Sequence, residues 1–149
     1  MPRVSAHRRA RYPWFVAIPT RFADNDAYGH VNNAHYHAYF DTAVSLFLGR
    51  ECGADFAGPR IDAIVENHCS YLRPIAFPDT VHAGVGLGEV GRSSARFEIG
   101  LFANEDDTAS AQGWFVQVRC DRASGQPVEI EADWREVFAR HAIREGAWA

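Results

Sequence analysis

Hydrophobic positions recur with a helical period in the second quarter of the chain. Between residues 33 and 49 the main apolar side chains are spaced four, three and four positions apart. This spacing places them on one face of an α-helix, and further apolar residues beside them broaden that face. Asn32 or Asn33 can cap the start of the helix, and Gly49 lies at its end. The pattern predicts one long buried helix with a stripe made by Tyr36, Phe40, Ala43 and Phe47.

Extended segments surround this helix. Trp14, Val16 and Ile18 take alternate positions in a β-prone stretch, which predicts a strand at residues 13–21. Beyond the helix, runs of strand-forming residues are separated by Gly, Pro, Asn and Asp, which suit hairpins or short crossings. These runs predict strands at about residues 62–73, 80–90, 94–103 and 109–121.

The order of these elements predicts the fold class. A strand and a long helix are followed by four strands with short links, and strands close in sequence usually pair. We therefore expect an α+β domain in which one helix packs on a face of an antiparallel sheet. The 149 residues fit a single domain, 1–149, with a basic N-terminal arm at about 1–12 and a C-terminal helical tail at about 131–149. The arm is expected to be a frayed, solvated terminus.

Composition and charge narrow the classes of protein. With 47% hydrophobic and 13% aromatic residues, the chain can build a core without disulfides or metal. The net charge is −4 and all 15 cations are Arg, which disfavours a nucleic-acid binder and leaves no Lys for a Schiff base. Three Cys without a CxxC motif favour a reducing cytoplasm over a disulfide framework. The longest apolar run near the N-terminus, 14–18, is too short for a signal peptide or a membrane span.

The segment at residues 21–33 holds the densest cluster of chemically useful side chains. It contains carboxylates, Asn amides and one His between the first strand and the start of the long helix. A helix N-terminus offers free N–H groups and the positive end of the helix dipole. A carboxylate beside such donors can act on a carbonyl group whose oxygen develops negative charge. This segment is therefore the candidate site.

The same segment resembles a known family. The pattern D-x-D-x-x-G-H-V-N-N-x-x-Y-x-x-Y-F-D, which begins at Asp24, is similar to the signature of hotdog-fold acyl-CoA thioesterases of the 4-hydroxybenzoyl-CoA thioesterase type. The stretches 71–74 with 78–79, 91–94 and 118–127 resemble the later landmarks of that family. The likeness covers roughly residues 13–130.

The resemblance implies a fold, an activity and an assembly. The fold is a hotdog, a long helix wrapped by a curved antiparallel sheet, and the substrate is an acyl-CoA thioester cleaved to free acid and CoA. Asp26 is implied as the catalytic carboxylate, either attacking the carbonyl carbon or activating water. Asn33 supplies a backbone N–H to the carbonyl oxygen, and Arg92 and Ser93 contact the CoA portion. No metal or organic cofactor is implied, and the active sites lie at the subunit interface of a homodimer or homotetramer.

Other residues are secondary candidates. His30 either orients the site or is an ordinary histidine at a helix entrance, and Tyr36 either lines the substrate site or packs in the core. Glu66 lies on the strand next to the expected acyl pocket, where the ordinary explanation for it is an exposed or subunit-facing edge. Asp24 is expected to make structural hydrogen bonds to the turn, together with Arg21. A metal site is disfavoured because the His spacings match no ligand motif and a helix would point His35 and His37 about 200° apart.

Two alternatives to a thioesterase stay open. Some related hotdog enzymes that hydrate or dehydrate acyl thioesters use a His with a carboxylate, which keeps a hydratase or dehydratase in view. A non-catalytic module that only binds acyl thioesters is the other alternative. No GxSxG motif accompanies any Ser, so a serine hydrolase is disfavoured.

Overall fold

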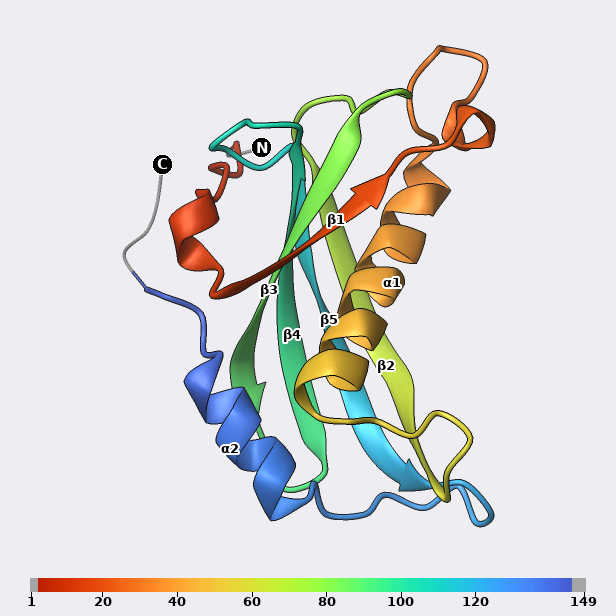
Figure 1. Ribbon diagram of the computed structural model, residues 1–149, viewed down its shortest axis with the longest axis vertical. Coiled ribbons are helices and arrows are strands. Elements are labelled where there is room, and N and C mark those ends of the chain that lie inside the picture. The colour runs from red at the N-terminus through yellow and green to blue at the C-terminus, as the bar shows by residue number, and fades with distance from the viewer. Residues whose placement is uncertain (1–2, 146–149) are drawn as a thin grey trace.

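The computed structural model describes residues 3–145, which form one five-stranded antiparallel sheet and two α-helices (Figure 1). The strand order is β1-β3-β4-β5-β2. The hairpins β3–β4 and β4–β5 follow the sequence, whereas β1 and β2 lie at opposite edges of the sheet. The elements are η1 (Arg9–Arg11), β1 (Trp14–Pro19), η2 (Phe22–Asp24), α1 (Asn33–Glu51), β2 (Arg60–Tyr71), β3 (Thr80–Val90), β4 (Ser94–Ala103), β5 (Ala111–Asp121) and α2 (Ala132–Arg140).

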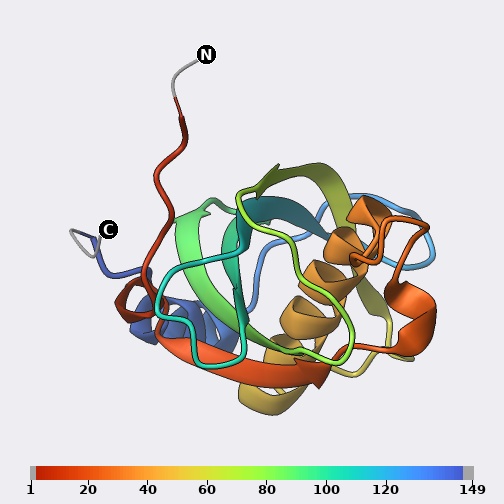
Figure 2. The same cartoon turned by 90° about the horizontal axis from the view of Figure 1, so that it is seen from above.

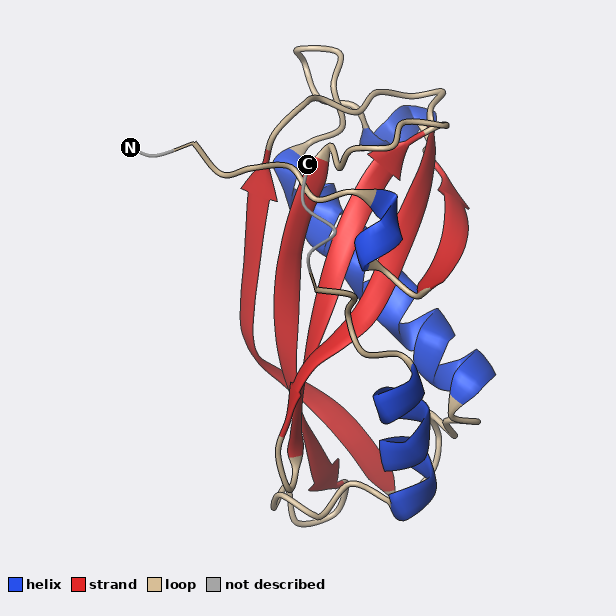
Figure 3. Cartoon of the chain, turned by 90° about the vertical axis from the view of Figure 1, so that its left-hand side faces the viewer, coloured by secondary structure: helices blue, strands red, loops and turns tan. Residues whose placement is uncertain are grey.

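The long helix α1 fills the concave side of the sheet, and the sheet curves around it (Figure 2). The predicted stripe is buried, with Phe40, Ala43 and Phe47 fully enclosed and Tyr36 only 4% exposed. Both α-helices lie on the same side of the sheet (Figure 3). The expected α+β arrangement of one long helix on an antiparallel sheet is therefore confirmed.

The end of α1 differs from the prediction. The helix continues to Glu51, so Gly49 lies within its last turn and does not end it. The glycine that ends the helix is Gly53, whose φ of 64° is in the left-handed region that favours glycine. At the start, the Asn32 side chain accepts a hydrogen bond from the N–H of Ala34, as a helix cap does.

The N-terminal arm is packed against the sheet, so the expectation of a frayed terminus is wrong for residues 5–12. The His7 N–H donates to Gln112 Oε1, and Gln112 Nε2 donates back to the Ser5 carbonyl. Arg8 forms a bridge with Thr108, in the link between β4 and β5. Sequence composition missed this docking because the groups that hold the arm, among them Gln112, Asp106 and Asp107, lie about a hundred positions away along the chain.

Tyr12 anchors the arm on the sheet. Gly84 of β3 and Gly100 of β4 stand directly opposite one another, and the buried Tyr12 ring lies over them. A Cβ atom at Gly84 would lie 2.8 Å from Tyr12, and one at Gly100 would lie 2.5 Å from it. The two glycines therefore leave the space that the tyrosine ring occupies.

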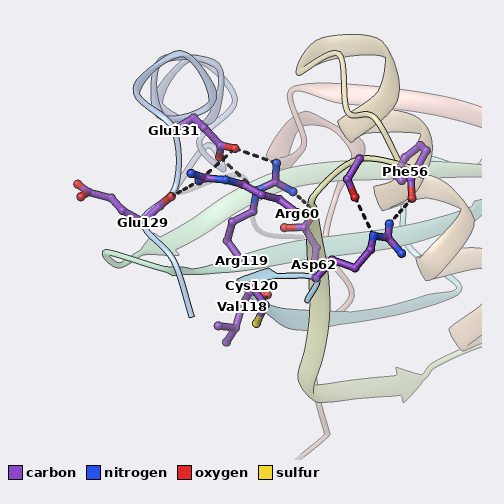
Figure 4. Close-up of polar contacts among 10 residues, drawn as sticks. Phe56, Arg60, Asp62, Val118, Arg119, Cys120, Glu129 and Glu131 are labelled. Carbon is purple, nitrogen blue, oxygen red and sulfur yellow. Dashed lines mark hydrogen bonds and ion pairs between the residues drawn. The ribbon is translucent and has the colours of Figure 1, made fainter. Parts of the chain in front are cut away.

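Arg119 joins three elements at the other end of the molecule (Figure 4). From β5 it donates to Asp62 of β2 at 2.8 Å and to Glu131, the residue before α2, at 2.9 Å. Its guanidinium also lies 3.9 Å from the ring centroid of Trp134 in α2. This ion pair network holds α2 against the sheet. Within residues 3–145, no helix is long and apolar enough to cross a membrane.

Candidate functional site

The loop between β1 and α1 is organised around a buried carboxylate, Asp24. This side chain is 1% exposed and accepts hydrogen bonds from the Arg21 N–H and Nε, both at 2.9 Å, and from the Tyr39 hydroxyl at 2.7 Å. Burial alone would raise the pKa of Asp24, but these hydrogen bonds and the charge of Arg21 outweigh it and lower the pKa below 3.8. The expected structural role of Asp24, with Arg21 as partner, is confirmed.

Asp26 lies two residues further on, in a tight reverse turn. Its N–H donates to the His30 carbonyl at 2.8 Å, and its carbonyl accepts from the N–H of Gly29. Gly29 has a φ of 77°, a conformation that glycine adopts without strain. One carboxylate oxygen, Oδ1, accepts from the Tyr28 N–H at 2.8 Å. The turn thus fixes the Asp26 carboxylate next to the first residues of α1.

The segment after β2 closes this loop from the other side. The Val31 N–H donates to the Ile75 carbonyl at 2.7 Å, and the Phe77 N–H donates to Asn25 Oδ1. The Ile75 N–H in turn donates to the Tyr36 hydroxyl at 3.3 Å. Two segments about fifty residues apart in the sequence are therefore tied together.

A cavity of about 350 Å³ lies between these two segments. Four of the seven site residues predicted from the sequence line it together. They are Asp26, His30, Asn33 and Tyr36. The remaining lining residues are Val31 and the stretch 71–74.

The first turn of α1 presents a backbone donor to this cavity. The Asn32 side chain binds the N–H of Ala34, and its carbonyl accepts from the N–H of His35. Within residues 3–145 the Asn33 N–H has no acceptor, and Asn33 lines the cavity. The N–H groups of a helix's first turn lack partners inside the helix, so this one remains for a ligand. The Tyr71 hydroxyl donates to the Asn33 carbonyl at 3.3 Å and holds the same turn.

The other three predicted residues lie elsewhere in the chain. Arg92 and Ser93 are in the turn between β3 and β4, at the end of the sheet opposite the Asp26 loop (Figure 1). The Arg92 side chain is 78% exposed and lies 4.0 Å from Glu129. Glu66 is exposed on β2 and lines a separate hollow with Arg96. A single chain therefore does not bring these three residues to Asp26.

Tyr71 and Arg73 line the cavity but were not predicted as site residues. They lie about thirty positions beyond the end of the N-terminal signature, and only a likeness of the stretch 71–74 to a family landmark pointed to them. Strand pairing decides where that stretch lies, and β2 pairs with the distant β5. The likeness of the stretch 71–74 to a family landmark was visible in the sequence, but it did not indicate that the Tyr71 and Arg73 side chains line this cavity.

In the described part of the chain, the histidines and cysteines do not form a metal site. Between residues 3 and 145, no group of three or more His, Cys, Asp or Glu side chains could hold a metal ion. His35 approaches Asp24, with Nδ1 at 3.9 Å from Oδ1, whereas His37 stacks on Phe115. Burial raises the pKa of the Cys69 thiol to about 11, so this thiol is protonated at neutral pH.

The architecture defines the class of the protein. A long helix enclosed by a curved five-stranded antiparallel sheet is the hotdog fold, as the resemblance implied. Residues 20–138 match the family model of the thioesterase-like superfamily, and the chain belongs to this family.

Individual relatives are similar to this chain over most of its length. The crystal structure of the PA5185 protein from Pseudomonas aeruginosa strain PAO1 is 39% identical, with a TM-score of 0.90, over 93% of this chain and 97% of that one. A thioesterase from Thermus thermophilus, crystallised with coenzyme A and Zn, is 32% identical, with a TM-score of 0.72, over 87% and 95% of the two chains. The uncharacterized protein YsmA of Bacillus subtilis strain 168 is 22% identical over 130 residues, which are 87% of this chain and 88% of YsmA.

Proposed function

We propose that this protein hydrolyses acyl-CoA thioesters to a free acid and CoA. The observation that carries the proposal is the shared cavity of Asp26 and the unpartnered Asn33 N–H at the N-terminus of α1. A carboxylate and an oxyanion donor that line one small space are what acyl transfer requires. Membership of the thioesterase-like superfamily supports a thioester as the bond that is cleaved.

The chemistry follows from these two groups. The thioester oxygen accepts from the Asn33 N–H, which stabilises the negative charge that forms on it during attack. Asp26 either takes a proton from the attacking water or attacks the carbonyl carbon itself to form an anhydride that water then cleaves. In both routes the C–S bond breaks, CoA leaves as a thiolate and acquires a proton. His30 lines the same cavity and serves to orient the substrate or the water.

CoA is the proposed carrier of the acyl group. The Thermus thermophilus relative was crystallised with coenzyme A, which supports a CoA-type ligand for this fold. The proposed reaction needs no metal or organic cofactor, because the carboxylate and the helix N–H supply both the base and the oxyanion donor.

We further propose that the active form is a homodimer, or a tetramer built from such dimers, paired through the free edge of β2. This strand lies at the edge of the sheet and exposes Ile64, Val65 and Tyr71. A two-fold axis makes the paired strands antiparallel, so each β3–β4 turn approaches the Asp26 end of the other copy. Arg92 and Ser93 of one subunit thereby come to the site of its neighbour, at the subunit interface. Glu66 lies near the middle of the same edge.

The test is thiol release from a panel of acyl-CoA substrates by the wild type and by Asp26→Asn. We expect kcat to fall about 100-fold or more in Asp26→Asn, because an acid–base or nucleophilic group is lost. Asp133→Asn is the matched control, since Asp133 is an exposed carboxylate in the first turn of the other helix, α2. Circular dichroism of all three proteins confirms that they are folded. Equal activity in Asp26→Asn and wild type would contradict the assignment.

The same panel separates the alternatives. A hydratase changes the absorbance of an enoyl-CoA without releasing thiol. A binding module releases no thiol and changes no absorbance, but acyl-CoA still raises its Tm. Either result with a folded wild type overturns the thioesterase proposal.

A further inference from the structure

A second hollow adjoins the Asp26 cavity. It has a volume of about 930 Å³ and lies between the N-terminal arm, the end of β2 and the link between β4 and β5. The two spaces share a wall made of Tyr71, Leu72 and Arg73. A ligand too long for the Asp26 cavity can therefore continue past this wall into the larger hollow.

The larger hollow is lined by positive charge. Arg73 and Arg3 are the charged residues of its lining in the described chain, and Asp106, the carboxylate that lies 3.5 Å from Arg73, is not among the lining residues. The positive lining contrasts with the net charge of the whole protein, which is −4. Such a hollow attracts an anion more strongly than the surrounding surface does.

Arg73 is held in place by contacts that leave part of its guanidinium free. Its Nη2 donates to the Thr108 carbonyl at 2.7 Å and to the Thr108 hydroxyl at 2.9 Å, and lies 3.5 Å from Asp106 Oδ2. Within residues 3–145 these are the polar contacts found for the Arg73 side chain, so Nε and Nη1 remain for a ligand. The side chain is 46% exposed, which permits contact with a ligand in the hollow. A planar, fixed guanidinium is well suited to bind phosphate.

We propose that Arg73 binds the phosphate groups of CoA and that Arg3, which lines the same hollow, adds to the same anion site. This inference rests on the proposed function. With the thioester beside Asp26, the pantetheine arm passes over Tyr71 and Leu72, and the first phosphates reach Arg73. β2 ends at Tyr71, so pairing of two chains through β2 leaves Arg73 beyond the paired residues.

Arg73 and Arg92 are distinct candidates for CoA recognition. Arg73 lines the Asp26 cavity of its own chain, whereas Arg92 reaches such a cavity only from a second subunit. The two residues can therefore be separated by substitution. Arg73 is assigned here as the contact that each chain provides to its own substrate.

The experiment compares two substrates that differ only in the nucleotide and phosphate portion of the carrier. The same acyl group is supplied on CoA and on pantetheine, and KM and kcat are measured for the wild type, Arg73→Gln and Arg73→Lys. For Arg73→Gln we expect KM for acyl-CoA to rise about tenfold, with KM for acyl-pantetheine and kcat for both nearly unchanged. Arg73→Lys keeps the charge and should recover part of the loss. Raising the ionic strength should increase KM for acyl-CoA less in Arg73→Gln than in the wild type.

Arg140→Gln is the matched control, because Arg140 is an exposed arginine at the C-terminal end of α2 and lines neither the Asp26 cavity nor the larger hollow. An equal rise of KM for both substrates, or no rise for acyl-CoA, overturns the inference. If the wild type releases no thiol from either substrate, the proposed function fails, and equilibrium binding of CoA and pantetheine decides the inference separately. Weaker binding of CoA alone by Arg73→Gln then supports the phosphate site, and unchanged binding overturns it.

Discussion

Two carboxylates two positions apart have opposite environments in this protein. Asp24 is buried and is occupied by hydrogen bonds from Arg21 and Tyr39. Asp26 has one oxygen bound by the Tyr28 N–H and lines the cavity. The hydrogen bonds of Asp24 stabilise the loop, whereas Asp26 lies where a substrate can reach it. The resemblance to the thioesterase family suggested this division, and the burial of Asp24 is consistent with it.

Asp24 should stabilise the fold in a pH-dependent way. Because its folded-state pKa is lowered, this stabilisation is complete above the ordinary pKa of 3.8 and is lost as pH falls through the lowered value. We expect Asp24→Asn to reduce the free energy of unfolding by about 1–3 kcal/mol at pH 7, since it removes charge-assisted hydrogen bonds. The difference from wild type should shrink as pH falls below 3.8.

Urea unfolding at a series of pH values measures this difference. Glu105→Gln provides the control, because Glu105 is exposed in the link between β4 and β5. A difference between Asp24→Asn and wild type that stays constant down to low pH would show that the charge of Asp24 does not contribute.

At the scale of elements, the sequence predicted which segments are helices and which are strands better than it predicted where each element ends. The stripe on α1 and the alternation in the strands are repeated over many residues, so single exceptions did not disturb the prediction. The end of α1 depended on which glycine adopts a positive φ, and Gly53 does so instead of Gly49. The docking of the arm depended on Gln112 and Thr108, which are about a hundred positions away. No local pattern contains that information.

The arm should loosen in mild acid because of His7. Burial, and then the charge of Arg11, lower the pKa of His7 from 6.5 to about 4. A lowered folded-state pKa means that docking is strongest above pH 6.5 and weakens as pH falls towards 4. Hydrogen exchange, corrected for its intrinsic pH dependence, should show faster exchange of the Arg9 and Ala109 amides at pH 5 than at pH 7.

His7→Gln is the informative comparison for the arm, because glutamine has no charge to gain. In this variant the protection of the same two amides should not change between pH 7 and pH 5. If wild-type protection were also unchanged over this range, His7 would not be the group that controls docking.

At the scale of the whole molecule, the free edge of β2 should control assembly. The pairing of β2 with β5 skips Val65, which is 61% exposed near the middle of the edge. Val65→Lys places two like charges close to the two-fold axis of the proposed dimer. We expect the dissociation constant, measured by sedimentation, to rise about tenfold or more.

Phe22→Lys is the control for assembly, since Phe22 is 81% exposed in η2 and lies outside β2. It should leave the dissociation constant unchanged. An unaltered constant in Val65→Lys would argue against pairing through this edge.

The candidate site could be predicted only in part, for a reason that belongs to the whole molecule. Asp26, His30, Asn33 and Tyr36 are close in the sequence, so one motif and one helix start bring them to the same cavity. Arg73 joins them through sheet pairing. Only a second chain can bring Arg92, Ser93 and Glu66 to this cavity. The sequence of one chain does not show how a second chain is placed against it.

The tyrosine that covers the glycine pair has a consequence for how the sequence can vary. Gly84 and Gly100 have no room for a side chain while Tyr12 occupies the space above them, and a smaller residue at position 12 leaves their backbone exposed to water. The three positions are therefore not free to change one at a time. Their substitutions are coupled with those of two phenylalanines, because a Cβ atom at position 84 would also lie 2.9 Å from Phe15 and one at position 100 would lie 2.9 Å from Phe102, so loss of the Tyr12 ring alone does not make room for a side chain.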